Sequence, residues 1–175
     1  MPWRANAYAI YGGKDNTIQD CIARDTLTYA GLNISSTFNP RNFEGTTLVQ
    51  NMRIERCGGP FWSGQEFGAL WVMADDSPIS GVHLKNIDIT DSTFSGIMLR
   101  SETHKKPAHP MDLTFENVTV TNPGTAGLLI RDAMGTATFK NTKVVGVPNQ
   151  PVVRIQKPGT GTIQLNIDNL SSGLG

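Results

Sequence analysis

Carboxylates, arginines and aromatic side chains recur at the ends of short apolar segments along this chain of 175 residues. Sugar-binding clefts typically combine planar polar groups, which bond the hydroxyls, with an aromatic face, which contacts the sugar ring. Two carboxyls that flank one bond can also act as acid and base in glycoside hydrolysis. The residues that could line such a cleft are Tyr11, Asp15, Trp71, Asp75, Asp76, Arg100, Glu102 and Arg131.

Simpler roles are open to the aspartates and to the tryptophan. Asp15 follows Gly12-Gly13, and Asp75-Asp76 precede Ser-Pro, so all three are also consistent with turn formation. We expect Trp71 at an outward position, where a large aromatic side chain meets either a ligand or a covering loop.

The two arginines occupy equivalent positions in the chain, so a charge ladder is an alternative to a binding role. Arg100 would then pair with Glu102, and Arg131 with Asp132, on the surface. The two histidines of the segment 101–110 lack a third ligand at metal-binding spacing, so we expect no metal site.

A repeated pattern must position these side chains. Five times a small residue leads a short apolar strand, at intervals of roughly 24 to 38 residues, and no helical periodicity accompanies it. Such a repeat is typical of a solenoid. The expected strands are 8–10, 32–34, 70–72, 97–99 and 128–130, and 153–155 forms a sixth without the small leader.

A second column of the repeat reads apolar, polar, Asx, apolar, polar, apolar. The Asx interrupts the strand alternation and predicts a bend, and stacked coils about 4.8 Å apart would bond these side chains into a ladder. We therefore predict one domain, 1–175, folded as an all-β, right-handed parallel β-helix of about five to six coils. An antiparallel sandwich would reverse the pattern from strand to strand. The predicted ladder is Asp20, Asn51, Asn86, Asn117 and Asn141.

Charge and hydropathy limit the partners. Fifteen basic and fifteen acidic residues leave no net charge to attract nucleic acid or an anionic membrane surface. No apolar run approaches the ~20 residues that span a bilayer. Longer segments at 37–46, 75–80 and 101–110 follow the first strands on one side of the solenoid, where binding faces usually form.

Residues 3–18, Trp-Arg-Ala-Asn-Ala-Tyr-Ala-Ile-Tyr-Gly-Gly-Lys-Asp-Asn-Thr-Ile, and the later Gly-Ala-Leu-Trp at 68–71 resemble the catalytic β-helix of the bacterial α-1,3-glucanase and mycodextranase family of glycoside hydrolases. The resemblance implies a secreted, modular enzyme that hydrolyses α-glucan with inversion. It implies a polysaccharide partner and adds Trp3 and Arg4 to the substrate groove.

One departure from the family bears on catalysis. The family's catalytic aspartates include a Gly-Asp-Asp motif, which this sequence lacks. We therefore expect a fragment of a longer β-helix whose main catalytic aspartates lie upstream, with Asp15 as the one catalytic candidate here. We expect no signal peptide at Met1, and we expect an uncapped first coil to favour association through the N-terminal end.

Two other functions fit the same fold. A polysaccharide lyase would need calcium-binding carboxylates and a basic residue on one strand face. A carbohydrate-binding or adhesin module would need no chemistry, and its columns would be purely structural. Glycoside hydrolysis requires no cofactor, and calcium remains open.

Overall fold

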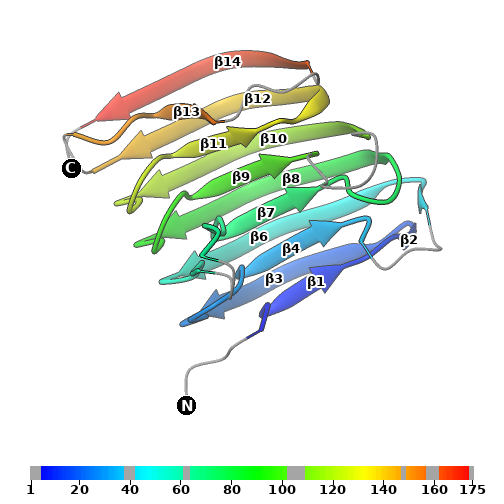
Figure 1. The fold of residues 1–175 in the computed structure, drawn as a ribbon, viewed down its shortest axis with the longest axis horizontal. Helices are drawn as coiled ribbons and strands as arrows, with labels where there is room; N and C mark the ends of the chain where they lie inside the picture. Colours follow the sequence, from blue (N-terminus) through cyan, green and yellow to red (C-terminus); the bar gives the residue numbers. More distant parts are fainter. Residues whose placement is uncertain are drawn as a thin grey trace.

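The computed structural model describes residues 5–37, 42–60, 64–101, 109–146, 149–156 and 162–173. Within them the chain winds into a parallel β-helix (Figure 1). This part of the chain contains no helix long and apolar enough to cross a membrane. Trp3, Arg4 and Glu102 lie outside the described residues.

Two six-stranded sheets form the walls of the solenoid, and each coil contributes one strand to each wall. The short-strand sheet contains, in order, β1 (Tyr8–Ile10), β4 (Leu32–Ser35), β7 (Leu70–Met73), β9 (Ile97–Arg100), β11 (Leu128–Arg131) and β13 (Val153–Gln156). The long-strand sheet contains β3 (Thr17–Arg24), β6 (Thr47–Glu55), β8 (Ile79–Thr90), β10 (Pro110–Thr121), β12 (Met134–Val145) and β14 (Ile163–Gly173). A small parallel pair joins β2 (Gly13–Lys14) to β5 (Phe43–Glu44).

Every strand pair in these sheets is parallel, which confirms the predicted fold and excludes the antiparallel sandwich. The expected first strands are all present. The sixth, at 153–155, pairs in register with β11 despite its missing small leader.

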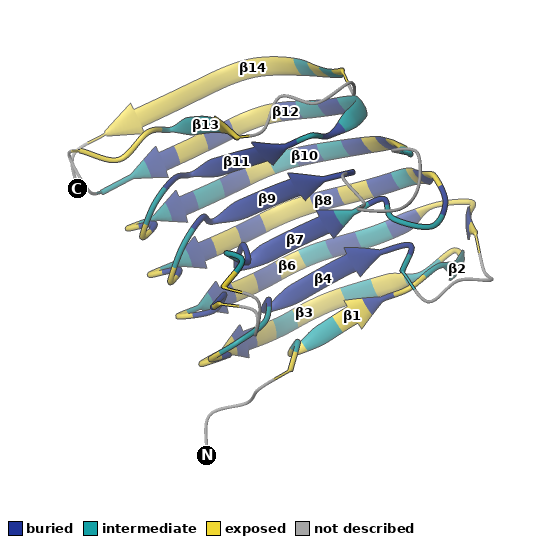
Figure 2. Ribbon diagram, viewed as in Figure 1, coloured by how far each residue is buried: buried dark blue, intermediate teal, exposed yellow. Residues whose placement is uncertain are grey.

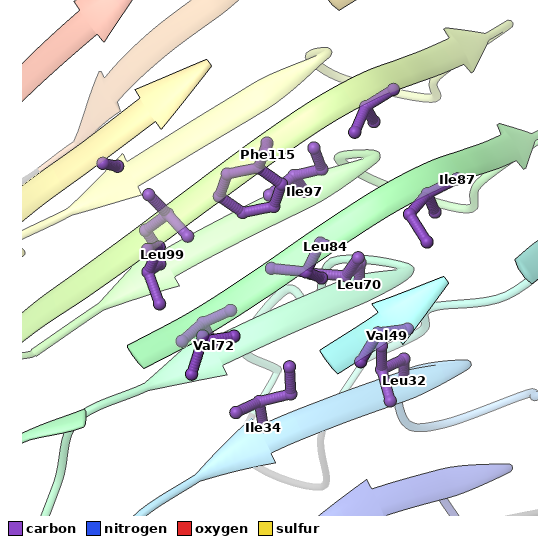
Figure 3. Packing of buried hydrophobic residues seen from close by; sticks show 14 of the residues in the cluster. Leu32, Ile34, Val49, Leu70, Val72, Leu84, Ile87, Ile97, Leu99 and Phe115 are labelled. Carbon is purple, nitrogen blue, oxygen red and sulfur yellow. The ribbon is translucent and has the colours of Figure 1, made fainter. Parts of the chain in front are cut away.

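The core lies between the two sheets. Leu32, Leu70 and Ile97 point inward from the short-strand sheet, and Val49 and Leu84 meet them from the long-strand sheet (Figure 3). Phe115 and Phe139 stack on successive coils with their ring centroids 4.6 Å apart and their planes 3° from parallel. Register pairing of like side chains thus fills the interior as continuous apolar columns.

The predicted Asx ladder is confirmed and is one member longer. Each amide nitrogen donates to the side-chain oxygen one coil earlier, at 3.0 Å for Asn51 to Asp20 and 2.7 Å for Asn141 to Asn117. Asn169 adds the sixth position at 3.2 Å from Asn141. All six residues have φ between 53° and 59°, the left-handed region that Asn and Asp tolerate best.

A second bend ladder, which the sequence analysis did not predict, ends each long strand. Its members are Asp25, Arg56, Asp91 and Asn122, all at positive φ, followed by Gly146. Arg56 donates two hydrogen bonds to the Asp25 carboxylate, at 2.6 and 3.0 Å, and Asn122 donates to Asp91 at 3.2 Å. A charged pair therefore replaces the amide contact in the first two coils.

The coil formed by β13 and β14 leaves inward side chains uncovered. Ile155 pairs in register with the inner residue Ile130, yet it is 66% exposed. Ile167 and Leu170 also remain exposed, and most of β14 is exposed (Figure 2). Association through the N-terminal coil stays a prediction, and apolar surface is also available at this opposite end of the solenoid.

Candidate functional site

The outer face of the short-strand sheet carries the predicted site residues in two rows. Asn33, Trp71, Met98 and Leu129 are register partners on successive strands. Ser35, Met73, Arg100 and Arg131 form the next outward row. The structure therefore places Trp71, Arg100 and Arg131 on one face, as the alternation of the strands predicts.

This face is buried rather than open, so Trp71 meets a covering segment, one of the two alternatives expected for it. Trp71 is 6% exposed, Arg100 is 7% and Arg131 is 8%. β4, β9 and β11 are buried along their whole length, so the sheet is covered on both sides (Figure 2). Because Arg100 and Arg131 are buried, a charge ladder through them would not lie on the exposed surface, and its pairing of Arg100 with Glu102 falls outside the described residues.

The segment Gly64 to Phe67, which we call the strap, lies over this face. Phe67 packs edge-on against Trp71 with ring centroids 4.0 Å apart, and also against Tyr29 at 5.3 Å. Gln65 accepts a hydrogen bond from Arg100 Nη1 at 2.9 Å. The segment between β6 and β7 thus supplies the cover that the outward aromatic side chain required.

The strap was not predicted, because the longer segments after the first strands indicated a binding side elsewhere on the solenoid. A signal was present. Gln65, Glu66 and Phe67 stand directly before the Gly68-Ala69 leader of β7, where polar and aromatic side chains at a strand entrance can fold back over the sheet.

Asp15 stabilises a turn in the described coils. It sits at φ 52° between β2 and β3, and its Oδ1 accepts a hydrogen bond from the backbone N–H of Thr46, 3.1 Å away. A Cβ on Gly45 would overlap this carboxylate, so only glycine fits beside it. Turn formation explains Asp15, and its catalytic role stays a prediction.

Asp75 and Asp76 form the turn after β7. Their backbone N–H groups donate to the Ser36 hydroxyl at 2.9 and 3.2 Å. Asp75 Oδ2 accepts a hydrogen bond from Thr37 Oγ1 at 3.3 Å. This arrangement fits the alternative of turn formation, and both side chains remain partly exposed.

The remaining candidates lie apart from the strap. Tyr11 is 39% exposed and its hydroxyl accepts a long hydrogen bond from Asn6, at 3.4 Å.

Among the described residues, no group of three or more His, Cys, Asp and Glu side chains is placed to hold a metal ion. Both cysteines are free thiols.

Perturbed acid–base groups lie away from the strap. Hydrogen bonding to Arg56 holds the pKa of the Asp25 carboxyl below its ordinary value, and the charges of Arg56 and Arg24 act in the same direction. Burial raises the pKa of the Tyr8 hydroxyl, and a hydrogen bond with Cys21 adds to the effect. Neither residue contacts Trp71 or Arg100 in the contacts described above, so we assign them no part in this site.

Solved structures of similar shape are α-1,3-glucanase catalytic domains. The GH87 enzyme solved with tetrasaccharides, as a single-aspartate variant, shares 30% identity at a TM-score of 0.79, over 94% of this chain and 33% of that one. The GH87 enzyme solved with nigerose shares 30% identity at a TM-score of 0.77, over 92% of this chain and 32% of that one. The catalytic unit of the thermostable GH87 enzyme from Streptomyces thermodiastaticus strain HF3-3 shares 26% identity at a TM-score of 0.81, over 96% of this chain and 32% of that one.

This chain spans about a third of the length of those catalytic domains. A search among curated proteins found no match. The family model described as α-1,3-glucanase catalytic domain D2 matches residues 1–165, which is nearly the whole sequence. The chain therefore belongs to the α-1,3-glucanase catalytic domain D2 family.

Proposed function

We propose that this chain is part of an enzyme that hydrolyses α-1,3-glucan, and that it supplies part of the surface that holds the polysaccharide. The observation that carries the proposal is the family match over residues 1–165. The similar structures solved with nigerose and with tetrasaccharides support a glucan as the ligand. A neutral chain also suits an uncharged polymer.

The outer face of the short-strand sheet is the surface we assign to the glucan. It combines a tryptophan, two arginines and the polar side chain of Gln65 within a few coils. Aromatic side chains supply a flat apolar surface for a sugar ring, and planar polar groups bond its hydroxyls. We propose that the strap moves to admit the sugar, because the face is covered in the present structure.

We place the acid and base of hydrolysis on coils outside this chain. Inversion requires two carboxyls separated by about 6.5–9.5 Å. Asp15 and Asp75 each accept a hydrogen bond that holds a turn, and the sequence has no Gly-Asp-Asp. The complete enzyme would act outside the cell, where an insoluble glucan is accessible.

A reducing-sugar assay on α-1,3-glucan tests this proposal. The 175-residue chain and a longer polypeptide with additional N-terminal coils are compared at equal concentration. Hydrolysis by the longer polypeptide alone is the expected result. Hydrolysis by the short chain would place the acid and base within it, whereas inactivity of both would favour a non-catalytic carbohydrate-binding module.

A further inference from the structure

Among the described residues, several polar atoms on the outer face of the short-strand sheet are buried without a hydrogen-bond partner, and Nε of Arg154 on β13 is one of them. Two others lie on adjacent strands: the side-chain oxygen Oδ1 of Asn33, on β4, and the indole nitrogen Nε1 of Trp71, on β7. Asn33 is 5% exposed and Trp71 is 6% exposed. Folding has removed both atoms from bulk water without giving either one a partner within the described part of the chain.

The two residues are neighbours. Asn33 and Trp71 are register partners on adjacent parallel strands, which places their backbones about 4.8 Å apart. One unpartnered atom is an acceptor and the other is a donor. They make no hydrogen bond with each other, so a single group can serve both only if it donates one hydrogen bond and accepts another.

A hydroxyl group has the chemistry that this pair requires, because it donates one hydrogen bond and accepts others. Neither a carboxylate, which cannot donate, nor an ammonium, which cannot accept, satisfies both atoms. The surroundings are apolar, since Trp71 packs with Phe67, Ala30, Met98 and Leu129. An uncharged, polyhydroxylated ligand with an apolar ring face therefore suits the position.

The two positions that follow Trp71 in the row indicate that folding does not demand a polar group there. Met98 and Leu129, the next two register partners of Trp71, are apolar and almost completely buried. An apolar side chain in place of Asn33 would avoid the cost of an unpaired buried oxygen. Unpartnered polar groups that persist in a buried row are expected where a ligand completes them.

We propose that Asn33 and Trp71 form a subsite that binds one hydroxyl of a glucosyl unit, with Asn33 as acceptor and Trp71 as donor. This inference rests on the proposed function and identifies two of its specificity-determining residues. Phe67 covers the Trp71 ring, so entry of the sugar requires the strap to shift from this position.

The test measures binding of an α-1,3-linked glucose tetrasaccharide by isothermal titration calorimetry. Trp71→Phe keeps the aromatic surface and removes the donor, and Asn33→Leu keeps the bulk and removes the acceptor. Each change should weaken binding about fivefold or more, the usual effect of one lost hydrogen bond. Circular dichroism identifies a temperature at which every variant is folded. Binding is measured at that temperature, so that a change in affinity reflects a change in the binding site.

The matched control is Thr142→Val. The Thr142 hydroxyl is also buried without a partner, but it lies in the interior, where it lines a cavity between the last coils. This variant should bind as the wild type does. Asn33→Leu and Thr142→Val should melt at or above the wild-type temperature, because each replaces an unsatisfied buried polar group by an apolar group of similar size.

The outcomes distinguish failure of the subsite from failure of the proposed function. If the wild type binds and both Trp71→Phe and Asn33→Leu bind equally well, the subsite is wrong and the proposed function stands. If the wild type binds no α-1,3-linked oligosaccharide, the proposed function fails and the subsite fails with it. Weaker binding by both variants with an unchanged Thr142→Val supports the subsite.

Discussion

The carboxylate of Glu66 accepts a hydrogen bond from Arg154 Nη2 at 2.8 Å, across 88 positions of the sequence. Arg154 belongs to the same outward row as Trp71, three strands further along the sheet. Together with the Gln65 to Arg100 hydrogen bond, this ion pair anchors the strap along the face that we assign to the glucan.

Weakening this anchor should open the strap without unfolding the coils. Glu66→Gln removes the negative charge from a pair whose side chains are about one-third exposed, at 31% and 30%. An ion pair of that exposure contributes about 0.2–1 kcal/mol. Hydrogen exchange at the Phe67 amide, which bonds to Gly59 O at 3.2 Å, should therefore accelerate up to about fivefold.

Lys85→Gln is the matched control for that experiment. It removes one partner of the exposed Lys85–Glu116 pair on the long-strand sheet, at 3.8 Å. Its Phe67 amide should exchange at the wild-type rate. Equal exchange at Phe67 in Glu66→Gln and the wild type would show that the strap is held by its apolar contacts alone.

The Asp25–Arg56 pair should make stability depend on pH at the acid end. The pKa of Asp25 is lowered in the folded protein, chiefly by its hydrogen bond with Arg56. The stabilisation is therefore fully present above the unfolded pKa, near 3.9, and is lost as pH falls through the lower folded pKa. In Asp25→Asn, which tolerates the same positive φ, the melting temperature should fall less between pH 6 and pH 2.5 than in the wild type.

Asp88→Asn provides the comparison, since Asp88 is an exposed aspartate in the middle of β8. Its acid melting profile should follow the wild type. Parallel profiles for Asp25→Asn and the wild type would mean that the second bend ladder adds no measurable stability.

The Asx ladder should depend on backbone conformation as much as on its hydrogen bonds. Asn86 has φ 54°, donates to Asn51 at 3.0 Å and accepts from Asn117 at 3.2 Å. Alanine would lose both bonds and also suffer about 1–2 kcal/mol of left-handed strain. Glycine would lose only the bonds, whose net contribution after exchange with water is about 0.5–1.5 kcal/mol each.

Urea unfolding checks that order. Asn86→Ala should lower the free energy of unfolding by about 1–2 kcal/mol more than Asn86→Gly. Asn169→Ala, at the last coil, should cost less than Asn86→Ala, because it interrupts the ladder only at its end. Equal losses for alanine and glycine at position 86 would show that strain does not contribute.

The fold could be predicted because its determinants are local and repeat. One Asx at a fixed place in each coil specifies the bend, and alternating apolar residues specify the inner face. Asn169 was missed because Ser172 stands where the pattern expects an apolar residue. The second ladder was missed because Asp25, Arg56 and Gly146 share a backbone conformation rather than a chemical type.

The site was harder to predict because its burial depends on contacts between distant residues. Strand alternation correctly placed Trp71, Arg100 and Arg131 on one outward face. No local pattern states that Glu66 reaches Arg154, so the covered state of that face could not be read from spacing. Asn33 lies within the predicted strand 32–34, and no spacing in the sequence shows that its side-chain oxygen is buried without a partner among the described residues.

Linkage-specific binding by the isolated chain tests the central claim most directly. Isothermal titration calorimetry would compare tetrasaccharides of α-1,3-linked and α-1,4-linked glucose at equal concentrations. We predict that the α-1,3-linked sugar binds at least about tenfold more tightly, a difference of ~1.4 kcal/mol. Equal affinity for the two sugars, or binding of neither, would contradict the assignment of this chain to an α-1,3-glucan groove.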